Sequence, residues 1–303
     1  MTALDSPSQT VLAAISKPSI KLLNASARLP VEAMRQKLSR LALSTVCQEA
    51  KCPNLNECWL GGTATLMIGG DTCTRGCRFC SVQTGNPQGW LNPDEPAHVA
   101  QVVTEGGWRY VVLTSVDRDD LPDGGAAHWA ACITAIRARS PGIKLEVLTP
   151  DFSGDAQAIQ KILASDVDVF AHNLETVARL TPTVRDRRAS YPQSLQVLKT
   201  AKALGAQYTK SSLMLGLGEQ PDEIHQAMQD LRAAGVDFLT LGQYLQPTAR
   251  HLPVTEMVSE SVFDHWREVA EQTYGFSYCA SGPLVRSSYQ AGQWFERFAK
   301  NNS

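Results

Sequence analysis

The sequence predicts an α/β fold, a partial (β/α)6 barrel of the TIM type with an extension at each end. Apolar runs suited to strands alternate with stretches of helical periodicity, the pattern of a parallel sheet built from βα units. There are six such units, fewer than the eight of a closed barrel. Polar side chains gather directly after four of the predicted strands, at the end where barrel enzymes carry their functional groups.

The predicted elements follow one another in a regular order. The six strands are 63–69, 109–115, 143–148, 167–171, 208–215 and 237–242. Helices are predicted at 31–43, 95–105, 125–139, 155–164, 191–204, 221–234 and 260–274. We therefore expect three regions: an N-terminal extension at 1–60, the barrel at 61–275 and a C-terminal extension at 276–303.

Composition narrows the class of protein. Of the 303 residues, 43% are hydrophobic and 19% are charged, as in globular proteins. The formal net charge of −2 gives no electrostatic reason to expect binding to nucleic acid or to a membrane surface. No apolar run approaches the roughly 20 residues of a membrane span, and the N-terminus lacks the pattern of a secretion signal. We therefore expect a cytoplasmic protein.

The eight cysteines are distributed unevenly. Six of them lie between Cys47 and Cys80, in two groups of three. In a cytoplasmic enzyme such a density indicates metal or redox chemistry rather than disulfides. The other two, Cys132 and Cys279, stand apart, and we expect them to pack as small buried side chains.

The second group, Cys73, Cys77 and Cys80, has the spacing C-x3-C-x2-C and follows the first predicted barrel strand. Four-iron clusters normally take four thiolates, so three thiolates leave one iron open, as a catalytic site requires. The alternative is a zinc loop. Zinc sites usually have four ligands and paired C-x2-C spacing, so the pattern favours the iron–sulfur interpretation.

This motif, with Phe79 directly before its last cysteine, resembles that of the radical S-adenosylmethionine (SAM) enzymes. The resemblance implies a 4Fe–4S cluster on Cys73, Cys77 and Cys80 whose open iron binds SAM. It also implies that SAM is cleaved to methionine and a 5′-deoxyadenosyl radical, which removes hydrogen from an unactivated carbon. Phe79 would lie beside the cluster, and Ser115 lies where this superfamily contacts the ammonium group of SAM.

Other side chains are candidates for binding SAM. Asn173 and Glu175, after the fourth barrel strand, can hydrogen-bond the ribose hydroxyls. Arginine binds carboxylates through two hydrogen bonds, and Arg188 is our first candidate for the SAM carboxylate. Arg185 and Lys210 are the next candidates. The alternative for the stretch from Arg185 to Arg188 is a solvated basic turn.

The first group, Cys47, Cys52 and Cys58, is again three thiolates, spaced C-x4-C-x5-C. The alternative to a second cluster is a structural metal site. The stretch from Cys47 to Trp59 resembles the auxiliary-cluster motif of lipoyl synthases. Further segments that resemble this family are 65–80, 112–121, 148–152, 172–176, 242–248 and 281–289.

In lipoyl synthases, a serine of the Arg-Ser-Ser-Tyr element is the fourth ligand of the auxiliary cluster. On this chain that role falls on Ser288, with Ser287 as the weaker candidate. Oxygen is a harder ligand than thiolate and matches the iron of a cluster less well, so we expect it to leave readily. The residues alone would also suit a capped turn near the C-terminus.

The resemblance implies a sulfurtransferase. Two sulfur atoms from the auxiliary 4Fe–4S cluster would be inserted at carbons 6 and 8 of an octanoyl chain on a lysine of a lipoyl carrier protein, with two SAM consumed. The carrier would be the E2 component of a 2-oxoacid dehydrogenase or the glycine cleavage H protein. A ferredoxin or flavodoxin would supply electrons, and an iron–sulfur carrier protein is a further expected partner.

Two positions depart from the family pattern: Ser212 replaces a usual glycine, and Gln290 replaces a frequent histidine. Two other functions remain open from the residues. One is a different two-cluster radical enzyme, which would not convert an octanoylated carrier protein. The other is an electron carrier or zinc-structured binding protein, which would hold its metal with four ligands and would not cleave SAM.

Overall fold

The computed structural model describes residues 25–41, 43–45, 52 and 54–301. Its main sheet has eight strands in the order β1-β2-β5-β6-β7-β8-β9-β10. The edge strand β1 pairs with β2 in antiparallel fashion, and all other pairs are parallel. The bounds are β1 Ser44–Thr45, β2 Thr63–Ile68, β5 Tyr110–Ser115, β6 Lys144–Leu148, β7 Val169–Ala171, β8 Tyr208–Leu215, β9 Phe238–Gln243 and β10 Tyr278–Gly282.

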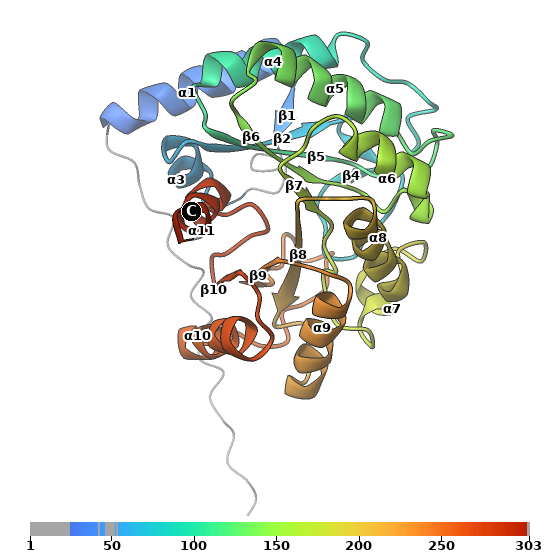
Figure 1. Cartoon of the computed structure of the whole chain (residues 1–303), viewed down its shortest axis with the longest axis vertical. Helices are drawn as coiled ribbons and strands as arrows, with labels where there is room; N and C mark the ends of the chain where they lie inside the picture. The colour runs from blue at the N-terminus through green and yellow to red at the C-terminus, as the bar shows by residue number, and fades with distance from the viewer. Residues whose placement is uncertain (1–24, 42, 46–51, 53, 302–303) are drawn as a thin grey trace, which may run out of the picture.

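Helices cover the outer face of this sheet, and the predicted α/β partial-barrel class is confirmed (Figure 1). Each of the six predicted barrel helices is present, within a few residues of its expected bounds. They are α4 Glu95–Gly106, α5 Ala126–Arg139, α6 Ala156–Leu163, α8 Tyr191–Ala203, α9 Pro221–Ala233 and α10 Glu260–Glu268. The last of these continues as a short π-helix at Val269–Thr273.

Local sequence signals begin several of these helices. The side chain of Asp155 accepts a hydrogen bond from the backbone of Gln157 at the start of α6, and Ser190 does the same for Gln193 at the start of α8. Such caps satisfy backbone N–H groups that the first helical turn leaves without partners. Proline follows the cap in α8 and α9, where its missing N–H costs nothing.

The two ends of the chain add elements that the barrel pattern did not predict. β10 lies within the predicted C-terminal extension and joins the sheet as its seventh parallel strand. The helix α3, Leu55–Leu60, leads into β2, and α11, Ala291–Asn301, follows β10. Figure 1 draws α3 and α11 near each other, and Gln293 of α11 lies close to Gly61 at the end of α3. The division into three regions stays a prediction.

The helix before the barrel begins earlier than expected. It is predicted at 31–43 and observed as α1, Ala25–Arg40, and it contacts α3 and α4. A short helix α7, Thr181–Val184, and a 3-10 turn at Phe152–Gly154 lie in loops at the carboxyl ends of strands. A two-stranded pair, β3 Thr72–Cys73 and β4 Gln83–Thr84, brackets the cysteine loop.

The amino ends of the strands are closed by aromatic packing. Tyr110, Tyr208, Phe238 and Tyr278 are the first residues of β5, β8, β9 and β10, and they pack against α11. Phe295 of α11 contacts Tyr110 at 5.7 Å between ring centroids. The opposite, carboxyl ends of the strands are therefore the end at which a site can open to solvent.

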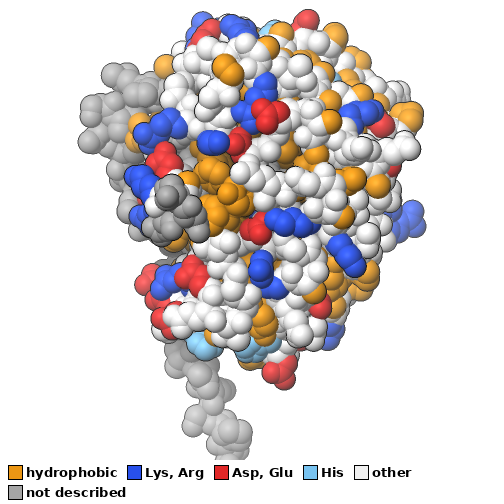
Figure 2. Space-filling model, viewed as in Figure 1, with side chains coloured by type: hydrophobic (Ala, Val, Ile, Leu, Met, Phe, Trp, Pro, Cys, Tyr) orange, Lys and Arg blue, Asp and Glu red, His pale blue; other side chains and the backbone are white. Residues whose placement is uncertain are grey.

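The described part of the chain has no helix that is long and apolar enough to cross a membrane. On the face shown in Figure 2, acidic and basic side chains are interspersed, as expected for a chain with a net charge near zero.

Candidate active site

The loop with the second cysteine group begins where β2 ends. Gly69 and Gly70 follow the strand with φ values of +79° and +92°, in the left-handed region that favours glycine. The chain then passes through β3 and the three cysteines before it returns at β4, and Gly85 N donates to Cys73 O at 2.9 Å. Cys73, Cys77 and Cys80 are all half-buried at the carboxyl end of the sheet.

Each of the three sulfur atoms accepts a backbone N–H. Arg75 N donates to Cys73 Sγ at 3.4 Å, and Asp186 N donates to Cys77 Sγ at 3.3 Å. The backbone of Val82 donates to Cys80. The three sulfurs do not all lie within 4.8 Å of one another, the spacing that one metal ion would need. They suit a larger, multi-metal cluster better than a single zinc ion.

The thiols need a cation to ionise. Burial raises the pKa of Cys73 to about 11 and of Cys77 to about 12, and it raises the pKa of Cys80 as well. Asp117 adds a negative charge nearby, and burial raises its own pKa to about 6. Bound iron would supply the positive charge that stabilises the thiolates, so the residues present fit an iron–sulfur cluster.

A buried arginine ties the cysteine loop to the barrel. Arg75 lies between Cys73 and Cys77 and is only 4% exposed. Its guanidinium donates to both oxygens of Asp151 at 2.7 Å and to Asp119 at 2.8 Å, and lies 3.3 Å from Asp117. These charged partners stand on the loops after β5 and β6, so the pairing fixes the loop against two neighbouring strands.

The predicted SAM contacts lie around this loop. Asn173 Nδ2 donates to Glu175 Oε1 at 3.1 Å, after the end of β7. Glu175 has φ +70°, and burial raises its pKa. Its charge affects the thiols of Cys77 and Cys80, which places it on their side of the barrel end. The backbone carbonyl of Ser212 accepts the N–H of Glu175, so the departure from glycine falls beside this turn.

Ser115 and Phe79 are placed by packing. Ser115 ends β5, accepts a hydrogen bond from Trp129 Nε1 at 3.1 Å and donates to the carbonyl of Val116. Phe79 packs against a small apolar cluster that includes Val184 and Tyr244. Their roles toward SAM stay predictions.

The three cations proposed for the SAM carboxylate differ in what they already contact. Arg188 is exposed and is engaged by Asp186 and Asp119. Lys210 is 2% exposed and donates to both oxygens of Glu146 at 2.9 Å, low in the barrel on β8. Arg185 is buried, with Nε lacking a partner, and its charge acts on Cys77. Of the three, Arg185 has a guanidinium atom left for a ligand.

A chain of hydrogen bonds supports Arg185. Its Nη1 donates to Ser194 Oγ at 2.6 Å, and that hydroxyl lies 3.0 Å from His172 Nε2. His172 Nδ1 lies 2.9 Å from the carbonyl of Thr149, which can only accept, so the proton of the neutral ring is on Nδ1. Burial lowers the pKa of His172 to about 4, with the charge of Arg185 as a further cause.

The first cysteine group is described for two of its three members. Cys47 lies outside the described residues. Cys52 is half-buried, and Cys58 is buried in α3. Burial raises the pKa of Cys58 to about 11, and the nearby Cys52 thiol contributes in the same direction. The two thiols therefore share one environment, as ligands of one cluster must.

The Arg-Ser-Ser-Tyr element reaches this cysteine group from the far end of the chain. Asn54 Nδ2 donates to Leu284 O at 2.5 Å, and Gln290 Nε2 donates to Glu57 Oε1 at 2.9 Å. The backbone N–H of Gln290 donates to the Cys58 thiol. The charge of Arg286 lowers the pKa of Cys52, against the larger effect of burial.

Ser288 lies within this contact region. Its hydroxyl accepts a hydrogen bond from Thr65 Oγ1 of β2 at 2.8 Å. Thr65 is separated from it by 223 residues in sequence. The element therefore contacts both β2 and α3, and the role of Ser288 as a cluster ligand stays a prediction.

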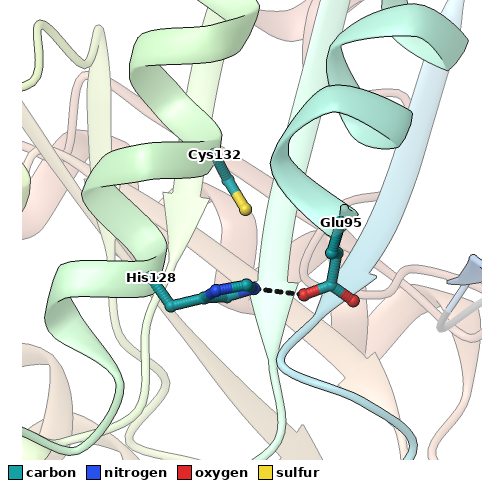
Figure 3. A group of neighbouring side chains, drawn as sticks. All are labelled: Glu95, His128 and Cys132. Carbon is teal, nitrogen blue, oxygen red and sulfur yellow. Dashed lines mark hydrogen bonds and ion pairs between the residues drawn. The ribbon is translucent and has the colours of Figure 1, made fainter. Parts of the chain in front are cut away.

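A third group of possible metal ligands lies apart from both cysteine groups. Glu95, His128 and Cys132 stand on α4 and α5 with their ligand atoms within 4.8 Å of one another (Figure 3). His128 contacts Glu95 directly, and the same Glu95 oxygen accepts the N–H of Gly69 at 2.7 Å. Because that oxygen is already used, we interpret the group as a hydrogen-bonded clamp on the glycine turn. Cys132 and Cys279 are buried, as expected.

Sequence reasoning assigned no role to several of these residues. Arg75 lies inside the cysteine motif, and Asp117, Asp119 and Asp151 lie in segments that resemble the family, so each residue could be noticed in the sequence. The ion pairs between them could not be predicted from the sequence, because they depend on which strand ends are neighbours. A basic residue between cluster cysteines with aspartates after the next two strands is the signal that could have found it.

Comparison with known proteins agrees with the geometry. Residues 67–231 match the model of the radical SAM superfamily. The chain is similar to the lipoyl synthase of Thermus thermophilus, 57% identical over 87% of this chain and 82% of that protein. It is also 57% identical to the mitochondrial lipoyl synthase of Branchiostoma floridae, over 85% of this chain and 70% of that protein.

Solved structures support the fold. Methylornithine synthase matches with a TM-score of 0.56, over 91% of this chain and 96% of that one, at 11% sequence identity. A maturase of the FeFe-hydrogenase matches with a TM-score of 0.58 over 84% of this chain and 66% of that one. With two cysteine groups on a partial barrel and sequence identity of this level across most of the chain, this protein belongs to the lipoyl synthase family of radical SAM enzymes.

Proposed function

We propose that this chain inserts sulfur at carbons 6 and 8 of an octanoyl chain attached to a lysine of a lipoyl carrier protein. The observation that carries the proposal is the second, separate cysteine group with the Arg-Ser-Ser-Tyr element packed onto it. A radical enzyme that only abstracts hydrogen needs one cluster. A second cluster next to the same barrel suits a reaction that consumes sulfur.

The enzyme uses two 4Fe–4S clusters and SAM. When bound, the cluster of the second cysteine group and SAM supply a radical that removes hydrogen from carbon. Cys73, Cys77 and Cys80 hold that cluster, and their backbone N–H partners keep the sulfurs in place. Asn173 and Glu175 bind the ribose of SAM, and Ser115 contacts its ammonium group.

For the SAM carboxylate we now place Arg185 before Arg188. Arg185 is buried beside Cys77 with a free Nε, whereas two carboxylates engage Arg188. Lys210 is the third residue of β8 and forms a buried ion pair with Glu146 inside the barrel. We propose that this buried pair shapes the floor of the barrel beneath the substrate.

At the auxiliary site, Cys47, Cys52, Cys58 and Ser288 would be the four ligands. The donor set of three thiolates and one hydroxyl oxygen fits iron, and Ser288 would be the ligand that leaves. Thr65 Oγ1 donates to the Ser288 hydroxyl at 2.8 Å, so Ser288 would have this hydrogen-bond partner when it is not bound to iron.

The partners follow from the reaction. We propose a ferredoxin or flavodoxin as electron donor, an iron–sulfur carrier protein to rebuild the auxiliary cluster, and octanoylated E2 or H protein as substrate. We propose the cytoplasm as the location, because cysteines that hold iron–sulfur clusters need reducing conditions to escape disulfide formation.

An anaerobic assay with an octanoyl-lysine peptide tests the function, with product mass as the readout. The reconstituted protein should hold about eight irons per chain and add two sulfur atoms to the peptide. About four irons would contradict the two-cluster proposal. SAM cleavage without any sulfur in the product would support a different two-cluster radical enzyme instead.

Two variants test whether the two clusters have separate roles. Cys52→Ala should still cleave SAM and should form no carbon–sulfur bond, because only the auxiliary cluster is lost. Ser288→Ala should behave in the same way. Its absorption and electron paramagnetic resonance spectra should show that the cluster on Cys73, Cys77 and Cys80 is intact. Full product formation by either variant would place the sulfur donor or the fourth ligand elsewhere.

A further inference from the structure

The segments around the radical-cluster loop are rich in arginine. Three segments meet there, 74–80, 181–190 and 246–255, which we call the basic rim. Together they contain six arginines and one aspartate, although the whole chain has a net charge of −2. The arginines are Arg75, Arg78, Arg185, Arg187, Arg188 and Arg250.

Backbone hydrogen bonds hold the three segments together. Arg78 N donates to Val184 O at 2.9 Å, and Leu252 N donates to Arg78 O at 3.3 Å. The ring of His251 lies 3.0 Å from Cys80 O. The Cys77–Cys80 stretch is therefore the middle of the rim, with one segment on each side.

Neighbouring side chains of this stretch point in opposite directions. Phe79 packs inward with Val184, Tyr244 and Leu252, while Arg78 is exposed. Arg187 and Arg250 are exposed on the flanking segments. The stretch from Cys77 to Cys80 thus carries an exposed arginine itself and lies between two segments that each carry another.

Three of the six arginines in the rim are already paired with carboxylates or buried. Arg75 is neutralised by Asp119 and Asp151, Arg188 is paired with Asp186, and Arg185 is buried. The three exposed ones differ. Within the described residues, Arg78, Arg187 and Arg250 have no carboxylate within 4.0 Å, and the side chain of Arg78 donates only to the carbonyl of Thr183. Their charges are available to a partner.

We propose that the basic rim docks a one-electron donor protein whose own redox centre is surrounded by acidic side chains. The proposal rests on the proposed function, which requires an electron to reach the cluster on Cys73, Cys77 and Cys80. Complementary charge speeds encounter and orients the donor, without the need for a large apolar interface. The backbone of Cys77 and Cys80 is itself part of the rim, so a donor bound there lies next to two of the cluster's ligands.

An acidic carrier protein would be attracted by the same charges. Its octanoyl-lysine arm, however, must reach the barrel end at which the half-buried Glu175 and the buried Arg185 lie. Arg78, Arg187 and Arg250 are exposed to solvent instead. The arrangement therefore favours the electron donor over the carrier as the occupant of the rim.

The test compares two triple variants that lose the same charge. The first is Arg78→Gln, Arg187→Gln and Arg250→Gln. The control is Arg35→Gln, Arg40→Gln and Arg139→Gln, all exposed on α1 and α5, away from the rim. Each reconstituted protein is mixed anaerobically with reduced flavodoxin, and cluster reduction is followed by absorbance at increasing salt. Dithionite, a small reductant, serves as a parallel donor.

The rim variant should be reduced by flavodoxin about tenfold more slowly at low salt, with a flatter salt dependence. Iron content and reduction by dithionite should equal those of the wild type, and the control variant should match it throughout. Reduction of the rim variant by flavodoxin at the wild-type rate and salt dependence would overturn the proposal.

Two further outcomes are informative. If the rim variant is reduced normally but shows a raised KM for octanoylated carrier protein when dithionite is the donor, the rim serves the carrier and the proposal is wrong. Reduction itself needs no sulfur insertion. A wild-type protein that accepts electrons at the rim but forms no lipoyl product would refute the proposed function and leave the docking surface standing.

Discussion

His172 shows how one buried side chain links the sheet to the candidate SAM site. It is 3% exposed, and its two ring nitrogens face Thr149 O and Ser194 Oγ. Ser194 in turn accepts from Arg185. A proton added to the ring would therefore face the charge of Arg185 in a site closed to water. The ring is therefore neutral at pH 7, with its pKa lowered to about 4.

Acid should destabilise the protein through His172. Its folded pKa of about 4 lies below the ordinary value of 6.5, so the unfolded chain takes up the proton first. Its contribution to folding is complete above pH 6.5 and is lost as the pH falls from 6.5 to 4, by about 3 kcal/mol. Urea unfolding of the cluster-free protein at pH 7 and pH 4.5 measures it.

His172→Gln should lose less stability over that pH range than the wild type, because the amide does not titrate. The exposed His265→Gln is the matched control and should keep the wild-type difference. Equal pH dependence in wild type and His172→Gln would show that His172 is not the source of the acid sensitivity.

Arg75 is the other single residue on which the site depends. Its removal in Arg75→Ala would leave the carboxylate of Asp151, itself 1% exposed, without its charged partner. We expect a loss of about 3–5 kcal/mol of unfolding free energy, measured in urea on the cluster-free protein. The exposed pair of Arg179 and Glu223 gives the comparison, and Arg179→Ala should cost less than about 1 kcal/mol. Equal costs would mean that the buried network is not what holds the loop.

At the scale of elements, the contact between the two chain ends depends on a close approach to β9. Gly242 lies in that strand, and a Cβ at this position would be only 2.1 Å from the carbonyl oxygen of Val285. Val285 leads into the Arg-Ser-Ser-Tyr element. Because the obstacle is backbone, no side-chain rotation could relieve the overlap.

Gly242→Ala should therefore push the 284–290 segment off the sheet and away from α3. We expect the reconstituted variant to lose the auxiliary cluster and to keep the cluster on Cys73, Cys77 and Cys80. Iron should therefore fall from about eight to about four per chain. Gly142→Ala is the control, because a Cβ there meets nothing within 4 Å. If Gly242→Ala kept both clusters, the position of the element would not depend on this contact.

The elements of the barrel were predictable from sequence, and the chain ends were not. The strands and helices of each βα unit have a clear periodicity and caps, so 208–215 and 95–105 were located nearly to the residue. β10, Tyr278–Gly282, is short and ends in a glycine, so its sequence does not distinguish it from a loop. Its strand conformation comes from pairing with β9.

The same division applies to the site. Cys73, Cys77 and Cys80 are close in sequence, so their spacing predicts a cluster with an open iron, and the resemblance of the motif implies its radical chemistry. From the sequence, Arg188 was the first candidate for the SAM carboxylate, and Arg185 and Lys210 were the next. Which of them has a free atom depends on Asp186, Asp119 and Glu146, and those contacts exist only in the folded chain.

At the scale of the whole molecule, the two ends of the barrel do different work. The carboxyl ends of the strands carry the cysteine loop and the SAM candidates. The amino ends are closed by α11, whose Phe295 lies against Tyr110, Tyr208 and Phe238. The same C-terminal region thus supplies the Arg-Ser-Ser-Tyr element and then a plug for the opposite end of the barrel.

Stability and iron binding should be separable because of this layout. Phe295 is 7% exposed, so Phe295→Ala leaves a cavity among aromatic rings and should cost about 3–5 kcal/mol of unfolding free energy. Leu204→Ala, at a residue that is 40% exposed, should cost less than about 1 kcal/mol. At a temperature where Phe295→Ala remains folded, it should still bind about eight irons per chain, because the ring of Phe295 packs on Tyr110, Tyr208 and Phe238 and on none of the described cysteines. A folded Phe295→Ala protein that bound about four irons would show instead that α11 holds the Arg-Ser-Ser-Tyr element in place, since the C-terminal region contacts the cysteine group of the proposed auxiliary cluster.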